Sequence, residues 1–175
     1  SGDPARKFFA ARLSEFADEI AAITGAKYTE ASLSEAVGVY NENRTLLRRF
    51  TELAATHPAT VTPRMRLCVI KSGYFCDRAE HNELLKTINS RLADLPTEKW
   101  KGKRVVTTGI IADSTEFLSA LEENGIRIVA DDVAHESRQF RTDVLSADID
   151  GIAKRYLSMH SCSLLYGGVT QRAKL

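Results

Sequence analysis

The sequence predicts an α/β fold in which a helical N-terminal half leads into a short, mostly parallel sheet with flanking helices, as in Rossmann-like or flavodoxin-like domains. Two observations predict it. Apolar residues recur at helical spacing through most of residues 1–98, and after Pro96 they gather instead in short runs separated by a further helical pattern. Strand, helix and strand in that order are typical of a βαβ unit. We therefore expect a helical segment over 1–98 and an α/β segment over 99–175, together forming one domain.

Composition narrows the class of protein. The 175 residues include 24 lysines and arginines against 23 aspartates and glutamates, a net charge of +1, which argues against a broad nucleic-acid-binding surface. No run of about 18 apolar residues predicts a membrane span, and the absence of a leader favours the cytoplasm. The three cysteines, Cys68, Cys76 and Cys162, form no CxxC pair, so neither a disulfide framework nor a zinc knuckle is expected.

Helix-start and helix-stop residues mark the helical half. Asp3 followed by proline predicts a helix start, and Gly25 a left-handed stop. Ser32 and Glu35 have the spacing of a capping box, so a second helix is expected from there to Pro58.

Two shorter helices are expected next. One should begin at Thr62-Pro63 and end near Gly73. The other should run over about 78–95, with four apolar residues on one face: Leu84, Leu85, Ile88 and Leu92.

The α/β half should open with a strand over 104–108. Asp113 and Glu116 have capping-box spacing for the helix that follows, and Asn124-Gly125 predicts its end. A second strand, over 126–130, is apolar enough to be covered on both faces.

The rest of the chain should hold a polar loop over 131–145, a helix over about 149–156 and a third strand over 163–166. Because so short a sheet leaves an edge uncovered, we also expect an exposed apolar patch or an oligomeric contact.

Ligands of open parallel sheets bind outside the carboxyl ends of the strands, and two segments fall there. The first contains Thr108 and Gly109, where backbone N–H groups before a helix could meet a phosphate or carboxylate. The dinucleotide fingerprint and the P-loop lysine are both absent from it. The alternative is an ordinary turn capped by Asp113, whose charge would repel an anion.

The second segment is the least ordinary part of the chain, because acids, a serine and arginines crowd behind a strand. It could bind a ligand or another protein through Asp131, Asp132, Ser137, Arg138 and Arg141. The alternative is structural: the two aspartates cap backbone donors, while the two arginines pair with Asp131, Asp132 or Asp143.

Other candidates are weaker. Cys76 and His81 lie near a helix start but lack a second pair of metal ligands, and the same holds for His160 with Cys162. Polar residues that interrupt the long helix, among them Asn43, more often join neighbouring elements than perform chemistry. No catalytic residue is assigned.

Six motifs, in order along nearly the whole chain, resemble the 2-hydroxyacyl-CoA dehydratases. Within that family the likeness is to beta subunits (component D) of the 2-hydroxyglutaryl-CoA type. The motifs are Tyr40–Arg44, Val105–Gly109, Glu122–Gly125, Val129–Asp132, Glu136–Asp143 and Cys162–Tyr166.

The resemblance implies a heterodimer of alpha and beta subunits, each with a [4Fe–4S] cluster held by cysteines. It also implies an ATP-dependent iron–sulfur activator that supplies one electron, and an acyl-CoA substrate that loses water through a ketyl radical to give an enoyl-CoA. The family's cluster cysteines correspond to none of the three cysteines here. We therefore expect a middle domain cut from a longer subunit, with no cluster of its own. Two alternatives stay open: a ligand-binding or interaction module of doubly wound type, and a subunit of a related benzoyl-CoA reductase.

Overall fold

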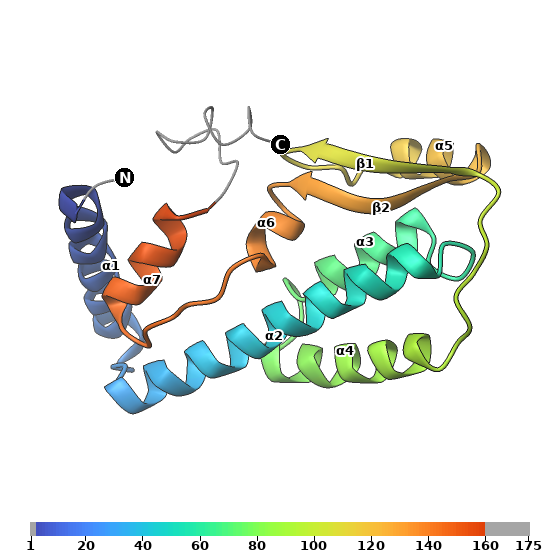
Figure 1. Ribbon diagram of the computed structural model, residues 1–175. Coiled ribbons are helices and arrows are strands. Elements are labelled where there is room, and N and C mark those ends of the chain that lie inside the picture. The colour runs from blue at the N-terminus through green and yellow to red at the C-terminus, as the bar shows by residue number, and fades with distance from the viewer. Residues whose placement is uncertain (1–2, 160–175) are drawn as a thin grey trace. The chain divides into compact units, whose positions relative to one another are not determined.

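The computed structural model describes residues 3–159 and confirms the predicted mixed α/β fold (Figure 1). None of the helices in this range is both long enough and apolar enough to span a membrane. The elements are α1 (Asp3–Thr24), α2 (Glu30–Thr56), α3 (Pro63–Ser72), α4 (Arg78–Ala93), β1 (Lys103–Gly109), α5 (Thr115–Glu123), β2 (Ile126–Val133), α6 (Ser137–Phe140) and α7 (Ile149–Leu157). The strand expected over 163–166 lies outside the described residues.

By packing, the chain divides into two compact units. Within the described residues, one is formed by 3–41 with 142–159, and the other by 42–141. As expected, the elements before about residue 98 are all helices, and both strands come after it. The boundary between the compact units, however, does not fall there. In the packing, α3 and α4 belong to the same unit as the sheet.

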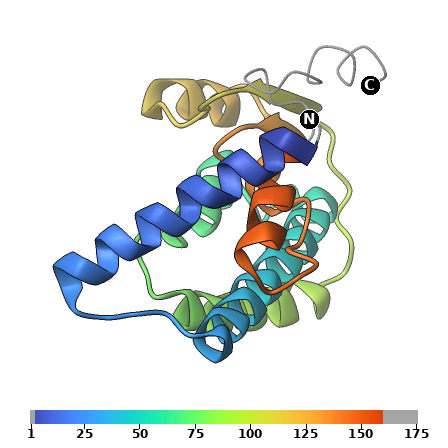
Figure 2. The same cartoon turned by 90° about the vertical axis from the view of Figure 1, so that its left-hand side faces the viewer.

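In the first unit, α1 and α7 lie side by side (Figure 2). The rings of Phe9 and Tyr156 join them, with centroids 5.0 Å apart. Asn41 contributes through its amide, which donates to the Val144 carbonyl at 2.8 Å and accepts from the Val144 N–H at 2.9 Å. This pair confirms that a polar interruption of the long helix joins neighbouring elements.

The second unit is built on the parallel pair of β1 and β2. Lys103 lies opposite Ile126, and Gly109 opposite Val133, with one irregularity between Val105 and Val106. In Figure 1 α3 lies below the sheet, and α5, which connects the two strands, contacts both β2 and α3. The apolar core is formed mainly by α2, α3 and α4 and contains Leu47, Phe50, Leu53, Ala54, Val61, Ile70, Leu85, Leu92 and Phe140.

A buried polar group also ties α2 to α4. The Asn43 side-chain amide contacts His81 Nδ1 at 2.8 Å and donates to Asn82 Oδ1 at 2.7 Å. His81 Nε2 lies 3.1 Å from the Val69 carbonyl, and burial lowers the pKa of its imidazole. His81 is therefore a hydrogen-bonded core histidine.

Two expected helix caps are wrong by a few residues. The second helix begins at Glu30, because Thr29 rather than Ser32 occupies the cap position and the two residues hydrogen-bond to each other's backbone N–H. Likewise α5 is capped by Ser114, whose hydroxyl accepts from the Phe117 N–H at 3.1 Å. Asp113 instead forms an ion pair with Lys71, so its side chain does not cap the helix.

Two further expectations change. The second strand continues to Val133, so Asp131 and Asp132 lie in β2 rather than in a loop. On α4, Leu85 and Leu92 are buried as expected, but Leu84 is exposed. Leucines at consecutive positions point about 100° apart on a helix, so Leu84 and Leu85 cannot both face the core centre.

Candidate functional site at the carboxyl ends of the strands

The two segments singled out from the sequence meet at the carboxyl ends of β1 and β2. Thr108 lies opposite Asp132 in the parallel register. The carbonyls of Gly109 and Ile110 accept from the N–H groups of residues 134 and 135, at 3.0 and 3.1 Å. The structure therefore brings the predicted residues to one end of the sheet, as the rule for open parallel sheets requires.

Asp132 is held by both predicted arginines. Arg138 donates to its two carboxylate oxygens at 3.0 and 2.8 Å, and Arg141 donates to Oδ1 at 2.8 Å. The hydrogen bonds from Arg138, followed by those from Arg141, lower the pKa of Asp132 against the opposing effect of burial. Arg141 also donates to the Asp131 carbonyl and to the Ser137 hydroxyl, at 2.7 and 2.8 Å.

Asp131 has a different set of partners. Its Oδ1 accepts from the backbone N–H groups of Val133 and Ser137 at 3.1 and 2.9 Å. The Ser137 hydroxyl donates to the Asp131 carbonyl at 2.8 Å. The carboxylate thus folds the chain back after the strand, as an Asx-type turn does.

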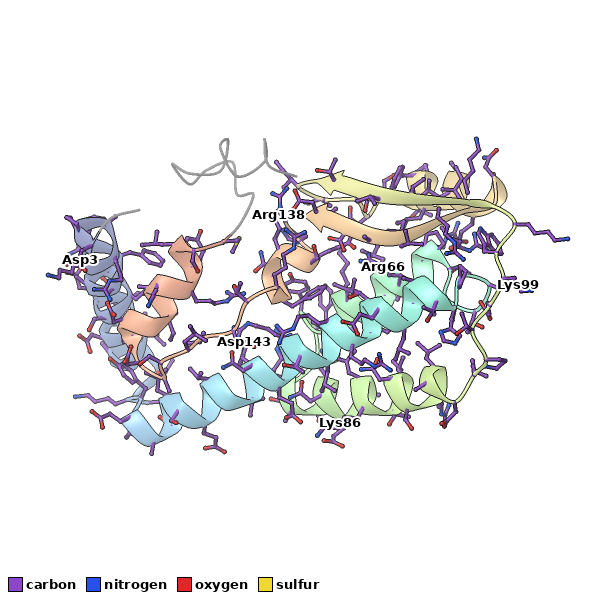
Figure 3. All side chains as sticks on the ribbon, viewed as in Figure 1. Asp3, Arg66, Lys86, Lys99, Arg138 and Asp143 are labelled. Carbon is purple, nitrogen blue, oxygen red and sulfur yellow. The ribbon has the colours of Figure 1, made fainter. Side chains whose placement is uncertain are left out.

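Arg66 of α3 is the residue that sequence reasoning missed. It forms ion pairs with Asp131 and Glu136, and all three side chains are at least 96% buried. Burial raises the pKa of Glu136, and the charge of Arg66 opposes that shift. The available signal was spacing: Arg66 lies one turn before Ile70, on the buried stripe of α3. Figure 3 shows Arg66 on α3 below the strands and Arg138 at their carboxyl ends.

Three arginines and three acids thus form one compensated group, which we call the carboxyl-end junction. It consists of Arg66, Asp131, Asp132, Glu136, Arg138 and Arg141. Each guanidinium contacts a carboxylate of the group and each carboxylate contacts a guanidinium. The structural alternative is therefore confirmed for Arg138 and Arg141, and the junction joins β2, α6 and α3. A ligand role for its members stays a prediction.

The first segment borders a pocket of about 560 Å³ beside β1. Thr107, Thr108 and Ser114 line it together with apolar residues of β1, the turn and α5. The Thr107 hydroxyl is buried and, within the described part of the chain, has no hydrogen-bond partner. Gly109 has φ 150°, a backbone conformation that side chains rarely adopt.

The residues that the structure describes do not fit an iron–sulfur cluster. Such clusters need several thiolates converging on the iron. Cys68 is exposed on α3, Cys76 lies in the turn before α4, and Cys162 falls outside the described residues. Across residues 3–159 no three His, Cys, Asp or Glu side chains are grouped to hold a metal. The carboxylate next to Cys76, that of Asp77, is already engaged, because it caps α4 by accepting from the Ala79 and Glu80 N–H groups.

The fold is mixed α/β, and the charged side chains of the junction join β2, α6 and α3 to one another. The chain belongs to the 2-hydroxyglutaryl-CoA dehydratase D-component family, whose model matches residues 2–175.

Three curated relatives are similar to it. It is 40% identical over 159 residues to the (R)-phenyllactyl-CoA dehydratase beta subunit of Clostridium sporogenes, a match that covers 90% of this chain and 42% of the relative. It is 36% identical to the lactoyl-CoA dehydratase subunit beta of Anaerotignum propionicum, covering 83% and 40%. It is 33% identical to the (R)-2-hydroxyglutaryl-CoA dehydratase subunit beta of Acidaminococcus fermentans, covering 87% and 41%. The chain thus spans about two fifths of the length of these relatives.

Proposed function

We propose that the chain is the middle domain of the beta subunit of a 2-hydroxyacyl-CoA dehydratase and serves there as a scaffold. The observation that carries the proposal is the family match over residues 2–175, supported by three relatives that are all named beta subunits of CoA-thioester dehydratases.

The complete enzyme would remove water from an (R)-2-hydroxyacyl-CoA and release an enoyl-CoA. This elimination involves no net oxidation or reduction, so the electron delivered by an ATP-dependent iron–sulfur activator would be recovered after each turnover. An alpha subunit would be the partner, and a [4Fe–4S] cluster would belong to the full-length beta subunit. These parts of the proposal come from the family resemblance, as does the expectation of a cytoplasmic enzyme.

The described residues suit the scaffold role. The junction places its charges in pairs at the carboxyl ends of the strands, and the side chains of Arg66, Asp131 and Glu136 are almost fully removed from solvent. Buried charges that are already paired would lose those partners on binding a ligand, which costs several kcal/mol. Such pairing would hold the carboxyl ends of β1 and β2 in a fixed position, against which neighbouring parts of the subunit could pack.

The two alternatives have less support. A ligand-binding module would use Arg138, but that side chain is 3% exposed and engaged with Asp132. A subunit of an aromatic-thioester reductase would share this scaffold, whereas the three relatives above are named dehydratase subunits.

An anaerobic dehydration assay tests the proposal. The full-length beta subunit is combined with its alpha subunit, the activator, ATP and a reductant, and offered (R)-phenyllactyl-, lactoyl- and (R)-2-hydroxyglutaryl-CoA. We expect enoyl-CoA from at least one thioester, and none when the activator is omitted. An assembled complex that dehydrates none of them, or one that reduces benzoyl-CoA instead, would overturn the proposal.

A further inference from the structure

Four polar side chains join α2 to the start of α4, and we call Asn43, Arg78, His81 and Asn82 the Asn43 cluster. Three of them, Asn43, His81 and Asn82, are at most 3% exposed. The Asn43 amide nitrogen lies 2.8 Å from His81 Nδ1 and 2.7 Å from Asn82 Oδ1. The Asn43 oxygen accepts from Arg78 Nη1 at 3.0 Å. The orientation of this one amide therefore decides which groups of the cluster donate and which accept.

Charged residues on two sides fix the orientation of the Asn43 amide. A guanidinium can only donate, so Arg78 requires the Asn43 oxygen on its side. A carboxylate can only accept, and Glu42, whose pKa is lowered chiefly by its hydrogen bond with Lys86, accepts from Asn82 Nδ2 at 3.1 Å. Asn82 therefore presents its oxygen to Asn43, which must offer its nitrogen there. Both charges select the orientation in which the Asn43 nitrogen faces the imidazole.

His81 must consequently be neutral in the folded protein. Its Nδ1 has to accept from Asn43, so the ring proton lies on Nε2, which donates to the Val69 carbonyl at 3.1 Å. A proton on Nδ1 would set two donors against each other and add a positive charge near Arg78. Burial lowers the pKa of the imidazole against the opposing effect of the Val69 carbonyl, and the charge of Arg78 lowers it further.

The turn between α3 and α4 packs directly against this imidazole. A Cβ placed at Gly73 would lie 2.8 Å from both His81 Cε1 and Arg78 Nη1, so ring and turn leave no free space between them. Tyr74 and Phe75 of the same turn are 50% and 85% exposed. Movement of this turn is therefore the shortest way for the ring to reach water.

We propose that the Asn43 cluster is a pH-sensitive switch, in which protonation of His81 opens the turn 73–77 and the first turn of α4. The switch goes beyond the proposed function and does not depend on it. An exposed imidazole binds a proton with the ordinary histidine pKa of about 6.5, whereas the closed cluster leaves no acceptor for one. The closed state is therefore fully favoured above about pH 6.5 and becomes less favoured as pH falls below that value.

Hydrogen exchange of the backbone amides in the full-length protein tests the proposal, with rates corrected for the intrinsic effect of pH. The amides of 74–76 and 79–81 report on the turn, because they donate to Lys71, Ser72 or Asp77. If opening is linked to one proton, it becomes about tenfold more frequent at pH 5.5 than at pH 7.5. We expect this rise in both groups of amides.

The surroundings of His57 provide an internal control. That imidazole is also buried, but its Nδ1 and Nε2 lie 2.8 and 3.3 Å from the Leu53 and Leu95 carbonyls. A proton on either nitrogen therefore meets an acceptor. Amides next to His57 should show no comparable rise in exchange at pH 5.5.

Two variants remove the acid effect by different means. His81→Asn places an amide oxygen, which does not titrate, close to the position of Nδ1. Asn43→Asp supplies a carboxylate that accepts from Arg78 and from a protonated imidazole alike. In both variants, opening of 73–81 should no longer rise between pH 7.5 and pH 5.5.

Three results would overturn the proposal. Equal exchange of the 73–81 amides at both pH values in the unmodified protein means that no switch is present. A tenfold rise that persists in either variant assigns the effect to another titrating group. A rise of equal size around His57 indicates general unfolding in acid. None of these measurements uses enzymatic activity, so a failed dehydration assay would count against the proposed function alone.

Discussion

The carboxyl-end junction lies in the same compact unit as four exposed apolar residues near β1, and the two groups reverse the usual distribution of residues. The four are Val106, Ile110, Ile111 and Phe117. The junction buries four of its six charged residues, Arg66, Asp131, Glu136 and Arg138, while Asp132 and Arg141 are partly exposed. Near β1, by contrast, apolar side chains are exposed, and about two thirds of Val106 and of Ile110 is accessible to solvent. Soluble domains normally show the opposite arrangement.

The difference separates charged side chains that are paired within the domain from apolar side chains that remain exposed in the described part of the chain. Charges can be buried at the junction because every carboxylate meets a guanidinium, so the group needs nothing further. Exposed apolar residues that lie close together are typical of surfaces that contact another part of a protein or a partner. Charged residues that stand out in a sequence can therefore serve the structure of their own domain, while apolar residues that attract less notice can be the ones left open to contact.

The largest expected effect comes from removing the centre of the junction. Arg66→Met leaves the Asp131 and Glu136 carboxylates buried with fewer partners, which should lower the free energy of unfolding by about 3–5 kcal/mol. Urea denaturation measures it. Arg49→Met is the matched control, because Arg49 pairs with Glu52 on the exposed surface of α2. Equal losses in both variants would contradict a structural role for the junction.

Asp132→Asn should have the next largest effect, because hydrogen bonds from two arginines lose a charged acceptor. We expect a loss of about 1.5–3 kcal/mol at neutral pH. The folded-state pKa of Asp132 lies below its ordinary 3.8, so its stabilising contribution is present above that pH and is lost as pH falls further. Unfolding curves of the two proteins should therefore converge below about pH 4. A difference that stays constant down to pH 2 would show that charge is not the cause.

A smaller effect, with the opposite sign, is expected at Thr107. Its buried hydroxyl lacks a partner in the described part of the chain, so Thr107→Val removes an unsatisfied group while keeping the branched shape. The free energy of unfolding should rise by about 1 kcal/mol. A fall of that size would show that the hydroxyl makes a hydrogen bond in the folded protein.

The smallest effect is expected for Lys71→Met. Lys71 and Asp113 pair on the surface, with about a third of each side chain exposed. Exposed pairs contribute little, because water and salt screen them. Thermal unfolding should shift far less than in the Arg66 variant, and a shift of similar size would mean that the junction is not special.

Local signals predicted the order of elements, because each depends on a few neighbouring residues. Asp3, Thr62, Gly73 and Gly125 mark helix ends that the structure confirms within a residue or two. The two misplaced caps, at Ser32 and Asp113, fail for a common reason. More than one nearby side chain can accept a backbone hydrogen bond at each place. At Asp113 the tertiary ion pair with Lys71 decides, whereas Thr29 and Ser32 divide the capping bonds between themselves.

The junction could be predicted only in part. The pairing of Arg138 and Arg141 with Asp132 was one of two readings, since all three lie within ten residues of one another. Arg66 stands 65 residues before Asp131, and no local pattern links them. The extension of β2 through two aspartates also needed the fold, because aspartate is unfavourable in strands unless a partner such as Arg66 meets it.

The proposed scaffold role implies that the charged residues of this domain serve its own structure, and that the ligands of an iron–sulfur cluster lie elsewhere in the subunit. Anaerobic reconstitution with iron and sulfide, performed in parallel on the 175-residue chain and on the full-length beta subunit, tests it most directly. Visible absorption and iron content should report a stable cluster in the full-length subunit and none in the shorter chain. A stable brown holoprotein formed by the 175 residues alone would contradict the claim.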